Sequence, residues 1–184
     1  MSVVLASGSP QRREILAKLG VEFEVLVSGA EELYGGDPEV EVVENARRKA
    51  RAVAAPDGAL TIGCDTDVVL DGRALGKPGD AAEARAYLDR MAGRAHTVLS
   101  GLVVLDGGEE RSGLEATTVV FKPLSDAEKE RYVAFGEWRD RSGGYAIQTL
   151  GSTLVERVEG SVSNVVGLPV WLLFELAPQV FTQP

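Results

Sequence analysis

Residues 3–13 read VVLASGSPQRR, an apolar run that passes directly into a loop of small residues and a proline. Residues 3–6 are typical of a short buried strand. Ser9 is a favourable N-cap and Pro10 fits the first position of a helix, while Gly20 is suited to the residue just after the helix end. The segment therefore predicts a strand, a tight loop and a helix.

Further strands are indicated by apolar runs between turn residues. The expected strands are residues 21–27, 60–64, 68–70 and a segment near 153–158, with residues 97–105 and 116–121 as a hairpin across Asp106-Gly107-Gly108. Between them lie helix signals. These are Asp37-Pro38 before a stripe of Val43, Ala46, Ala50 and Val53, capping boxes of Asp80 with Glu83 and Ser125 with Glu128, and a last helix over residues 169–176. Alternating strands and helices with a hairpin predict an α/β protein with a mixed sheet.

Composition limits the function. The chain has 184 residues, 45% of them hydrophobic and 26% charged, which predicts one domain over residues 1–184. A net charge of -9 disfavours binding to a nucleic-acid polymer. One cysteine and one histidine exclude an intramolecular disulfide and a His-rich zinc site, so a metal site must use carboxylates, which suit Mg²⁺ or Mn²⁺. Without a basic leader or a long apolar segment, we expect a cytoplasmic protein that does not bind membranes.

The first loop and helix supply candidate phosphate ligands. A helix N-terminus offers free N–H groups and partial positive charge to an anion. Ser7 and Ser9 add hydroxyls, and Arg12 and Arg13 add charge. The alternative is a capped helix with solvated arginines.

Candidate acids lie in two other segments. Asp65-Thr66-Asp67 follows an apolar run, so we expect its carboxylates at or beyond a strand end, where they can hold a hard cation or take a proton from water. Glu32, in a glycine-flanked loop, is a further candidate. For both segments the alternative is acids that face only solvent.

Two lysines complete the candidate set. Lys49 lies beside an apolar helix stripe and can reach inward, and Lys77 stands in the rigid Gly76-Lys77-Pro78 turn as a point charge for a phosphate. His96 has no partner that would make it catalytic, and we interpret it as a structural hydrogen-bonding residue. Together the hydroxyls, cations and carboxylates suit a triphosphate, a divalent ion and an activated water, and hydrolysis is the simplest outcome.

Several of these residues belong to motifs that occur in order from about residue 5 to residue 176. The motifs are Leu5-Ala6-Ser7-Gly8-Ser9-Pro10 with Arg12, Gly63-Cys64-Asp65-Thr66, Gly76-Lys77-Pro78, Gly93-Arg94-Ala95-His96, Gly143-Gly144-Tyr145-Ala146-Ile147-Gln148, Glu159-Gly160 and Asn164-Val165-Val166-Gly167-Leu168-Pro169. In these motifs the chain resembles the Maf family of nucleoside triphosphate pyrophosphatases.

The resemblance implies the fold of the inosine-triphosphate pyrophosphatases, with two lobes around a long mixed sheet and the site in the cleft. It implies cleavage between the α and β phosphates with a divalent metal, and by analogy a homodimer. Asp65 is then the proton acceptor and a metal ligand, and Glu32 a second metal ligand. The residues implied to bind phosphate are Ser7, Arg12, Lys49 and Lys77.

Three positions are associated with base selection in this family, here Gln11, Thr66 and Gln148. Thr66 and Gln148 resemble the branch that acts on dTTP and UTP, which predicts a pyrimidine substrate. Gln11 departs from it, because that branch usually has Arg there, whereas the branch acting on 7-methyl-GTP usually has Trp. A 7-methyl-GTP or other modified-nucleotide pyrophosphatase is therefore an alternative.

Other departures leave the implied catalytic groups in place. Asp67 stands at a usually apolar position and is either a further metal ligand or solvent-facing, and Ser142 and Val162 replace a usual Ala and a usual aromatic residue.

Two rival functions remain. A sugar-nucleotide transferase is disfavoured because its lysine closely follows the glycine loop, whereas Lys77 lies far downstream of Gly8. A non-catalytic nucleotide-binding regulator of septation is the alternative of a different class.

Overall fold

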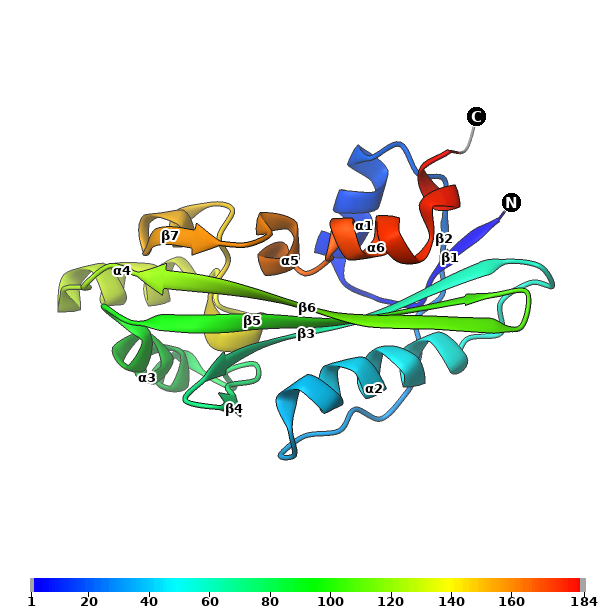
Figure 1. The fold of residues 1–184 in the computed structure, drawn as a ribbon. Helices are drawn as coiled ribbons and strands as arrows, with labels where there is room; N and C mark the ends of the chain where they lie inside the picture. Colours follow the sequence, from blue (N-terminus) through cyan, green and yellow to red (C-terminus); the bar gives the residue numbers. More distant parts are fainter. Residues whose placement is uncertain (1, 183–184) are drawn as a thin grey trace.

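Three long antiparallel strands run through the computed structural model, which describes residues 2–182 (Figure 1). They are β3 (Leu60–Leu70), β5 (Ala95–Asp106) and β6 (Glu109–Phe121). The shorter strands are β1 (Val3–Leu5) and β2 (Glu24–Val25), which are parallel to their neighbours, and β4 (Arg73–Ala74) and β7 (Val155–Glu159), which are antiparallel. The order is β2-β1-β3-β5-β6-β7, with β4 paired to β3. The predicted α/β fold with a long mixed sheet is confirmed.

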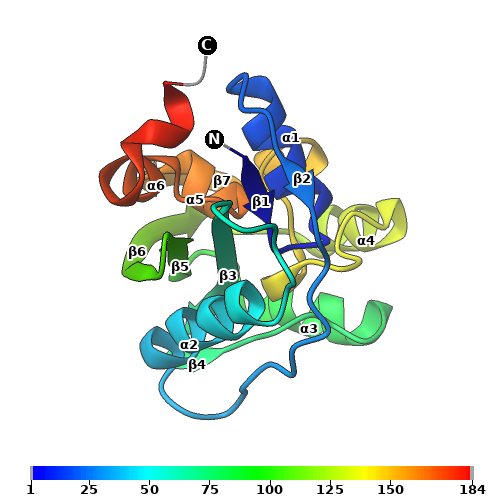
Figure 2. The same cartoon turned by 90° about the vertical axis from the view of Figure 1, so that its right-hand side faces the viewer.

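Helices cover both faces of this sheet. In Figures 1 and 2, α2 (Pro38–Arg51) lies on one face, and α1 (Pro10–Lys18), α5 (Val162–Val166) and α6 (Val170–Leu176) lie on the other. The pair α3 (Ala81–Met91) and α4 (Asp126–Phe135) lies at the end of the sheet away from β1. Three short 3-10 turns, η1 (Ser142–Gly144), η2 (Leu150–Thr153) and η3 (Pro178–Phe181), complete the chain. Between residues 2 and 182, no helix has the length and apolar character needed to cross a bilayer.

The helix starts follow the predicted caps. The Ser9 hydroxyl accepts a hydrogen bond from the Arg12 N–H, and the Asp37 carboxylate accepts one from the Glu39 N–H. Ser125 and Glu128 form the complete capping box. At α3 only half of the predicted box forms. Asp80 caps the Glu83 N–H, but the Glu83 carboxylate accepts from the Gly79 N–H.

Other local predictions are wrong. The strand expected over residues 21–27 shrinks to the two residues of β2, and the strands expected over 60–64 and 68–70 are one strand, β3. The buried stripe of α2 contains Val42 in place of Val43, together with the predicted Ala46 and Ala50, and Val53 lies beyond the end of the helix. Strand β4 and helix α5 were not expected. β3 is continuous because its polar middle keeps its backbone pairing, with Asp65 opposite Gly101 on β5.

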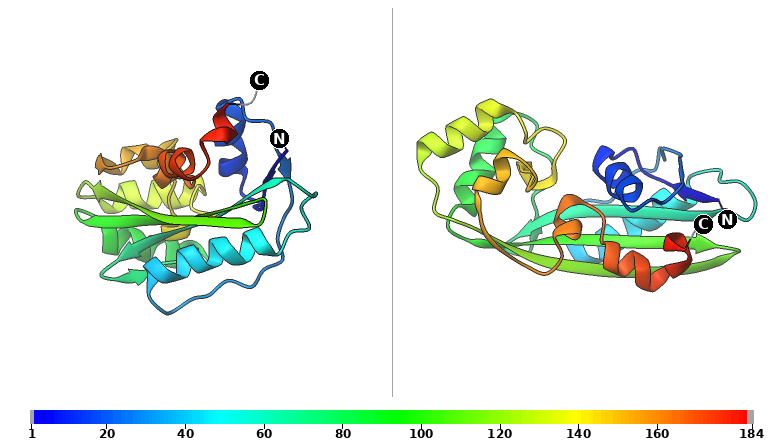
Figure 3. Two further views of the ribbon diagram at one scale, coloured as in Figure 1. Left: turned by 45° about the vertical axis from the view of Figure 1, so that its right-hand side comes forward. Right: turned by 90° about the horizontal axis from the view of Figure 1, so that it is seen from above.

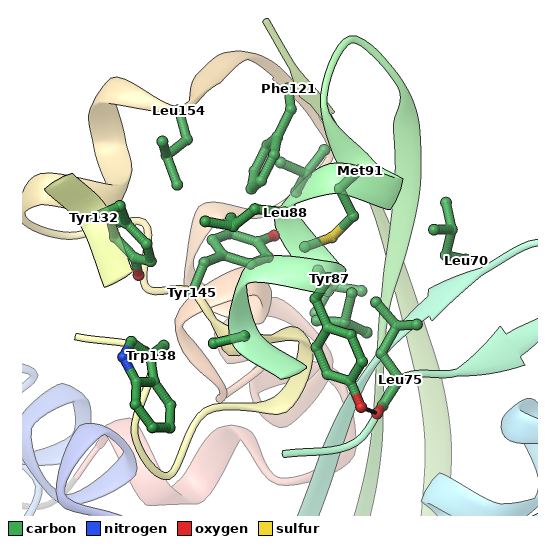
Figure 4. Close-up of a cluster of buried hydrophobic side chains, with 14 residues drawn as sticks. Leu70, Leu75, Tyr87, Leu88, Met91, Phe121, Tyr132, Trp138, Tyr145 and Leu154 are labelled. Atoms are coloured by element: carbon green, nitrogen blue, oxygen red, sulfur yellow. Dashed lines mark hydrogen bonds between the residues drawn. The ribbon is translucent and has the colours of Figure 1, made fainter. Parts of the chain in front are cut away.

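Strand β3 passes from one hydrophobic core to another. Its first part, with Leu60, Ile62 and Cys64, packs in a core with β1, α1 and α6. Its last part, with Val68 and Leu70, packs in a core with α3 and α4, where Figure 4 shows Tyr145 pointing in among the labelled side chains. In the view from above in Figure 3, the helices of the two cores also lie apart, with α1 and α6 toward one end of the sheet and α3 and α4 toward the other. The predicted two lobes therefore share one sheet, and residues 65–67 belong to neither core.

Two glycines let α2 lie directly on the sheet. A Cβ atom on Gly63 would lie 2.2 Å from the carbonyl oxygen of Ala46, and one on Gly101 would lie 2.2 Å from that of Val42. Any side chain at either position would force the helix away from β3 and β5. The close approach brings the middle of α2 next to Asp65.

Candidate active site

A pocket of about 940 Å³ opens where β1 ends beside the middle of β3. Ala6 donates its N–H to the Ile62 carbonyl at 2.8 Å, and beyond this bond β1 no longer covers that edge of β3. The pocket has the size of small-molecule sites. Every predicted site residue except Arg13 lines it, namely Ser7, Ser9, Gln11, Arg12, Glu32, Lys49, Asp65, Thr66, Lys77 and Gln148.

The expected position of the aspartates is wrong in one respect. Asp65 and Asp67 lie inside β3, not at or beyond its end. The strand end at the pocket is that of β1, because β1 is much shorter than β3. The pocket therefore still forms at a strand end, but the aspartates belong to the neighbouring strand.

Arg13 does not belong to the site. It is exposed and does not line the pocket, whereas Arg12 is buried. Successive helix residues point about 100° apart. Since the Arg12 side chain faces the pocket, that of Arg13 faces away.

On the α2 side of the pocket, Lys49 joins two carboxylates. Its Nζ atom lies 2.5 Å from Asp65 Oδ1 and 2.5 Å from Glu32 Oε1. The Lys49 side chain is 12% exposed and that of Asp65 is 14% exposed. Lys49 therefore reaches inward as expected, and two acids neutralise its charge. Its implied binding of phosphate stays a prediction.

Asn45 is a residue of this cluster that the sequence did not reveal. Its Nδ2 donates to Asp65 Oδ2 at 3.1 Å and to the Leu33 carbonyl at 3.1 Å, and its Oδ1 accepts from the Leu33 N–H at 2.7 Å. It is buried, one helix turn before Lys49 on α2. An asparagine within an otherwise apolar helix stripe was the available signal. Asn45 fixes both Asp65 and the loop that carries Glu32.

Glu32 and Asp67 have opposite electrostatic surroundings. Burial raises the pKa of Glu32, but hydrogen bonds from Lys49 and the Tyr34 hydroxyl outweigh it and leave the pKa below its ordinary value. Burial and the nearby charge of Asp65 raise the pKa of Asp67, although the Ser142 hydroxyl donates to its carboxylate. Asp67 also accepts from the Val68 N–H. Its hydrogen bonds thus tie β3 to η1.

On the α1 side, neutral groups hold Arg12. Its Nε donates to the Gly167 carbonyl at 2.8 Å, and its two terminal nitrogens donate to Ser7 Oγ at 3.0 Å and Thr66 Oγ1 at 3.1 Å. Arg12 is 8% exposed. The alternative of a solvated arginine is therefore wrong for Arg12. Among residues 2–182, no carboxylate forms an ion pair with Arg12.

Three other groups complete the pocket. Lys77 is exposed and forms no ion pair within the described part of the chain, and Gln148 is exposed at the pocket wall. Thr66 also hydrogen-bonds Ser100, with its oxygen 2.8 Å from that hydroxyl. The pocket thus has unneutralised cations in a protein with a net charge of -9.

His96 is buried against Phe121 and Tyr145, two residues of the core that contains α3 and α4. Its Nε2 is 2.8 Å from the Tyr145 hydroxyl, and its ring packs edge-on against Phe121. Burial lowers the pKa of His96 to about 4, so the ring is neutral at pH 7. This supports the structural interpretation, with Nε2 bonded and Nδ1 without a partner in the described part of the chain.

The donor set fits a hard divalent cation. Glu32 and Asp65 converge on one point, currently the Lys49 ammonium group. No group of three or more His, Cys, Asp or Glu side chains that could hold a metal occurs among residues 2–182. Mg²⁺ often uses one or two carboxylates together with substrate phosphates, so two protein carboxylates suffice.

The mixed sheet, the pocket between two cores and the facing carboxylates and cations define an α/β protein with a site for a small anionic ligand. A family model described as "Maf-like protein" matches residues 2–180, and the chain belongs to the Maf family.

Named relatives match nearly the whole chain. It is 49% identical to a dTTP/UTP pyrophosphatase of Deinococcus radiodurans, over 95% of this chain and 90% of the relative. It is 43% identical to a dTTP/UTP pyrophosphatase of Thermococcus gammatolerans, over 98% of this chain and 100% of the relative.

Solved structures match in part. The Ham1 protein of Staphylococcus aureus has a TM-score of 0.46 at 16% identity, over 66% of this chain and 72% of that one. A nucleoside-triphosphatase of Mycobacterium abscessus, titled a dITP/XTP pyrophosphatase, has a TM-score of 0.42 at 18% identity, over 67% of this chain and 76% of that one.

Proposed function

We propose that this protein is a nucleoside triphosphate pyrophosphatase that hydrolyses a dTTP/UTP-type substrate to the monophosphate and pyrophosphate. The observation that carries the proposal is the Asp65 carboxylate, held by Lys49 and Asn45 in a pocket that also contains Arg12. Membership of the Maf family and the names of relatives at 43% and 49% identity support the reaction.

The proposed chemistry starts at Asp65. Its carboxylate accepts a proton from water as the water oxygen bonds to the α phosphorus. The bond from that phosphorus to the α–β bridging oxygen breaks, and pyrophosphate leaves with the electron pair. Lys49 and Asn45 each occupy one oxygen of Asp65, so they fix the direction in which the carboxylate faces the water.

The cations of the pocket and the N-terminus of α1 bind the phosphates in this proposal. Arg12 uses three of its N–H groups within the protein and keeps others for phosphate oxygens. Lys77 brings a point charge from the Gly76-Lys77-Pro78 turn. The N-terminus of α1, capped by Ser9, adds N–H groups and the positive end of the helix dipole.

A divalent cation, Mg²⁺ or Mn²⁺, would be held by Glu32 and Asp65. When bound, it neutralises charge on the phosphate oxygens. The low pKa of Glu32 keeps this ligand ionised at neutral pH. Lys49 must then share or yield its contact with both acids.

The first experiment is a substrate panel. The protein with Mg²⁺ or Mn²⁺ is given dTTP, UTP, CTP and 7-methyl-GTP, and monophosphate and pyrophosphate are measured directly. We expect pyrophosphate from dTTP and UTP, and at least about 100-fold slower release from the same panel with Asp65→Asn.

Other outcomes would contradict the proposal in distinct ways. Turnover of 7-methyl-GTP alone would assign the chain to a modified-nucleotide pyrophosphatase. Nucleotide binding without turnover by the folded protein would favour a non-catalytic regulator. A requirement for a sugar acceptor would indicate a transferase.

A further inference from the structure

Gln11 and Arg141 meet at the pocket wall, although they lie far apart in the sequence. Gln11 is in the first turn of α1, and Arg141 directly precedes η1. With the amide oriented so that both its ends find complementary partners, its oxygen accepts from the two terminal nitrogens of Arg141 at 2.6 and 2.8 Å, and its nitrogen donates to Ser9 Oγ at 2.9 Å. Gln11 therefore holds the Arg141 guanidinium in one orientation.

The charge of Arg141 is not neutralised. Several arginines elsewhere in the protein pair with acids, as Arg47 does with Glu110 and Arg94 with Asp71. Arg141 lines the pocket, and within the described part of the chain it forms no ion pair. Guanidinium carries five N–H donors, of which Gln11 takes two. The Nε side is left with donors that have no partner among residues 2–182.

We propose that Arg141, positioned by Gln11, recognises the base of the nucleotide by donating a hydrogen bond to the 4-carbonyl oxygen of uracil or thymine. The inference rests on the proposed function and goes further by naming the residue that reads the base. Arginine can only donate, so it suits a carbonyl oxygen. Cytosine has an amino group at the same position, which would face Arg141 donor to donor. Arg141 thus favours UTP over CTP.

The other cations of the pocket favour the base over a phosphate as the ligand of Arg141. Guanidinium takes a phosphate most strongly with two parallel N–H groups. In this protein the neutral Gln11 oxygen occupies one such edge of Arg141, which leaves the edge formed by Nε and the neighbouring terminal nitrogen for a ligand. A carbonyl oxygen needs only one donor. Arg12 and Lys77, which form no ion pairs among residues 2–182, remain for the phosphates.

The test compares three ligands with the variant Arg141→Gln. kcat/KM is measured for UTP and CTP, and Kd is measured for inorganic tripolyphosphate, which has no base. We expect the UTP to CTP ratio of kcat/KM to fall at least tenfold and the Kd of tripolyphosphate to change less than threefold. The control is Arg139→Gln, because Arg139 also lines the pocket but stacks on Trp138, and it should leave the ratio unchanged.

Two results would overturn the inference. An equal loss for UTP, CTP and tripolyphosphate would make Arg141 a phosphate ligand, and an unchanged ratio would give it no role in base recognition. If Arg141→Gln folds poorly, the same measurement is made on Gln11→Ala. We expect a smaller fall in the UTP to CTP ratio of kcat/KM. If the wild-type protein releases no pyrophosphate, the proposed function fails, and Kd values for UTP and CTP still test the inference.

Discussion

Lys49, which is partly buried, and Arg12, which is buried, are cations of one pocket, but opposite kinds of partner hold them. On the α2 side, Lys49 lies between the carboxylates of Glu32 and Asp65. On the α1 side, the carbonyl of Gly167 and two hydroxyls hold Arg12. The first cation is neutralised within the protein, and the second keeps its full charge.

This difference suits the two sides of the pocket to different functions. A neutralised lysine attracts a phosphate weakly. It does hold two acids in place, of which Asp65 is proposed to accept a proton and both are proposed to bind the metal. An arginine held by neutral acceptors stays available to an anion, and its burial strengthens that attraction. Changes on the α2 side should therefore affect the chemical step, and changes on the α1 side should affect nucleotide binding.

The largest expected effect tests the α2 side. Asp65→Asn removes the proton acceptor while keeping its shape, and kcat should fall about 100-fold to 10,000-fold. Nucleotide binding, measured by calorimetry, should persist. The matched control is Asp67→Asn, two residues along the same strand, which should cost far less activity. If Asp65→Asn keeps activity near that of the wild type, the α2 side does not supply the proton acceptor and the two sides do not differ as proposed.

The next effect tests the α1 side. Arg12→Lys keeps the charge but loses the donors to Ser7 and Thr66. Each hydrogen bond to a charged group contributes about 1.5–3 kcal/mol, so the loss of two should lower kcat/KM at least about 100-fold, mainly through KM. The control is Arg13→Lys on the exposed face of α1, expected to behave like the wild type. A fall in kcat with KM unchanged would place Arg12 in the chemical step instead.

A smaller effect is expected from Asn45→Ala. This change frees the Asp65 carboxylate and the loop that carries Glu32. Loss of such supporting hydrogen bonds typically lowers metal affinity about 10-fold or more. The affinity is read from the Mn²⁺ dependence of activity. Val40→Ala, at an exposed position of the same helix, is the control, and equal metal affinity in the two variants would contradict the role of Asn45.

The smallest effect is a dependence of stability on pH. The folded-state pKa of Glu32 lies below its ordinary value, so ionised Glu32 stabilises the fold above the ordinary glutamate range, and the stabilisation is lost as pH falls through the folded-state pKa. Urea unfolding should find the wild type more stable than Glu32→Gln at pH 7, with a gap that narrows below about pH 4. Exposed Glu31→Gln is the control. A gap that widens in acid would contradict the assigned surroundings of Glu32.

The local parts of this site could be predicted from the sequence. Ser9 and Pro10 specify the start of α1 through capping and a fixed backbone angle, which depend on neighbouring residues only. Asp65, Glu32 and the lysines were recognised by residue type and by resemblance to the Maf family. All of them line the pocket.

The remaining parts depend on contacts between distant segments. The polar middle of β3 resembles a strand end because the sequence does not show that Gly101 of β5 pairs with Asp65. Asn45 resembles an ordinary helix residue until α2 lies on Gly63 and Gly101. Arg141 was not among the predicted site residues, because only the folded chain brings it to Gln11.

We propose that water, activated on the α2 side, attacks the α phosphorus of a nucleotide held by the α1 side. Turnover of UTP in ¹⁸O-labelled water, followed by mass spectrometry of both products, tests it most directly. We expect one ¹⁸O atom in UMP and unlabelled pyrophosphate. Label in the pyrophosphate, or release of orthophosphate with UDP, would place the attack at another phosphorus and show that this mechanism is wrong.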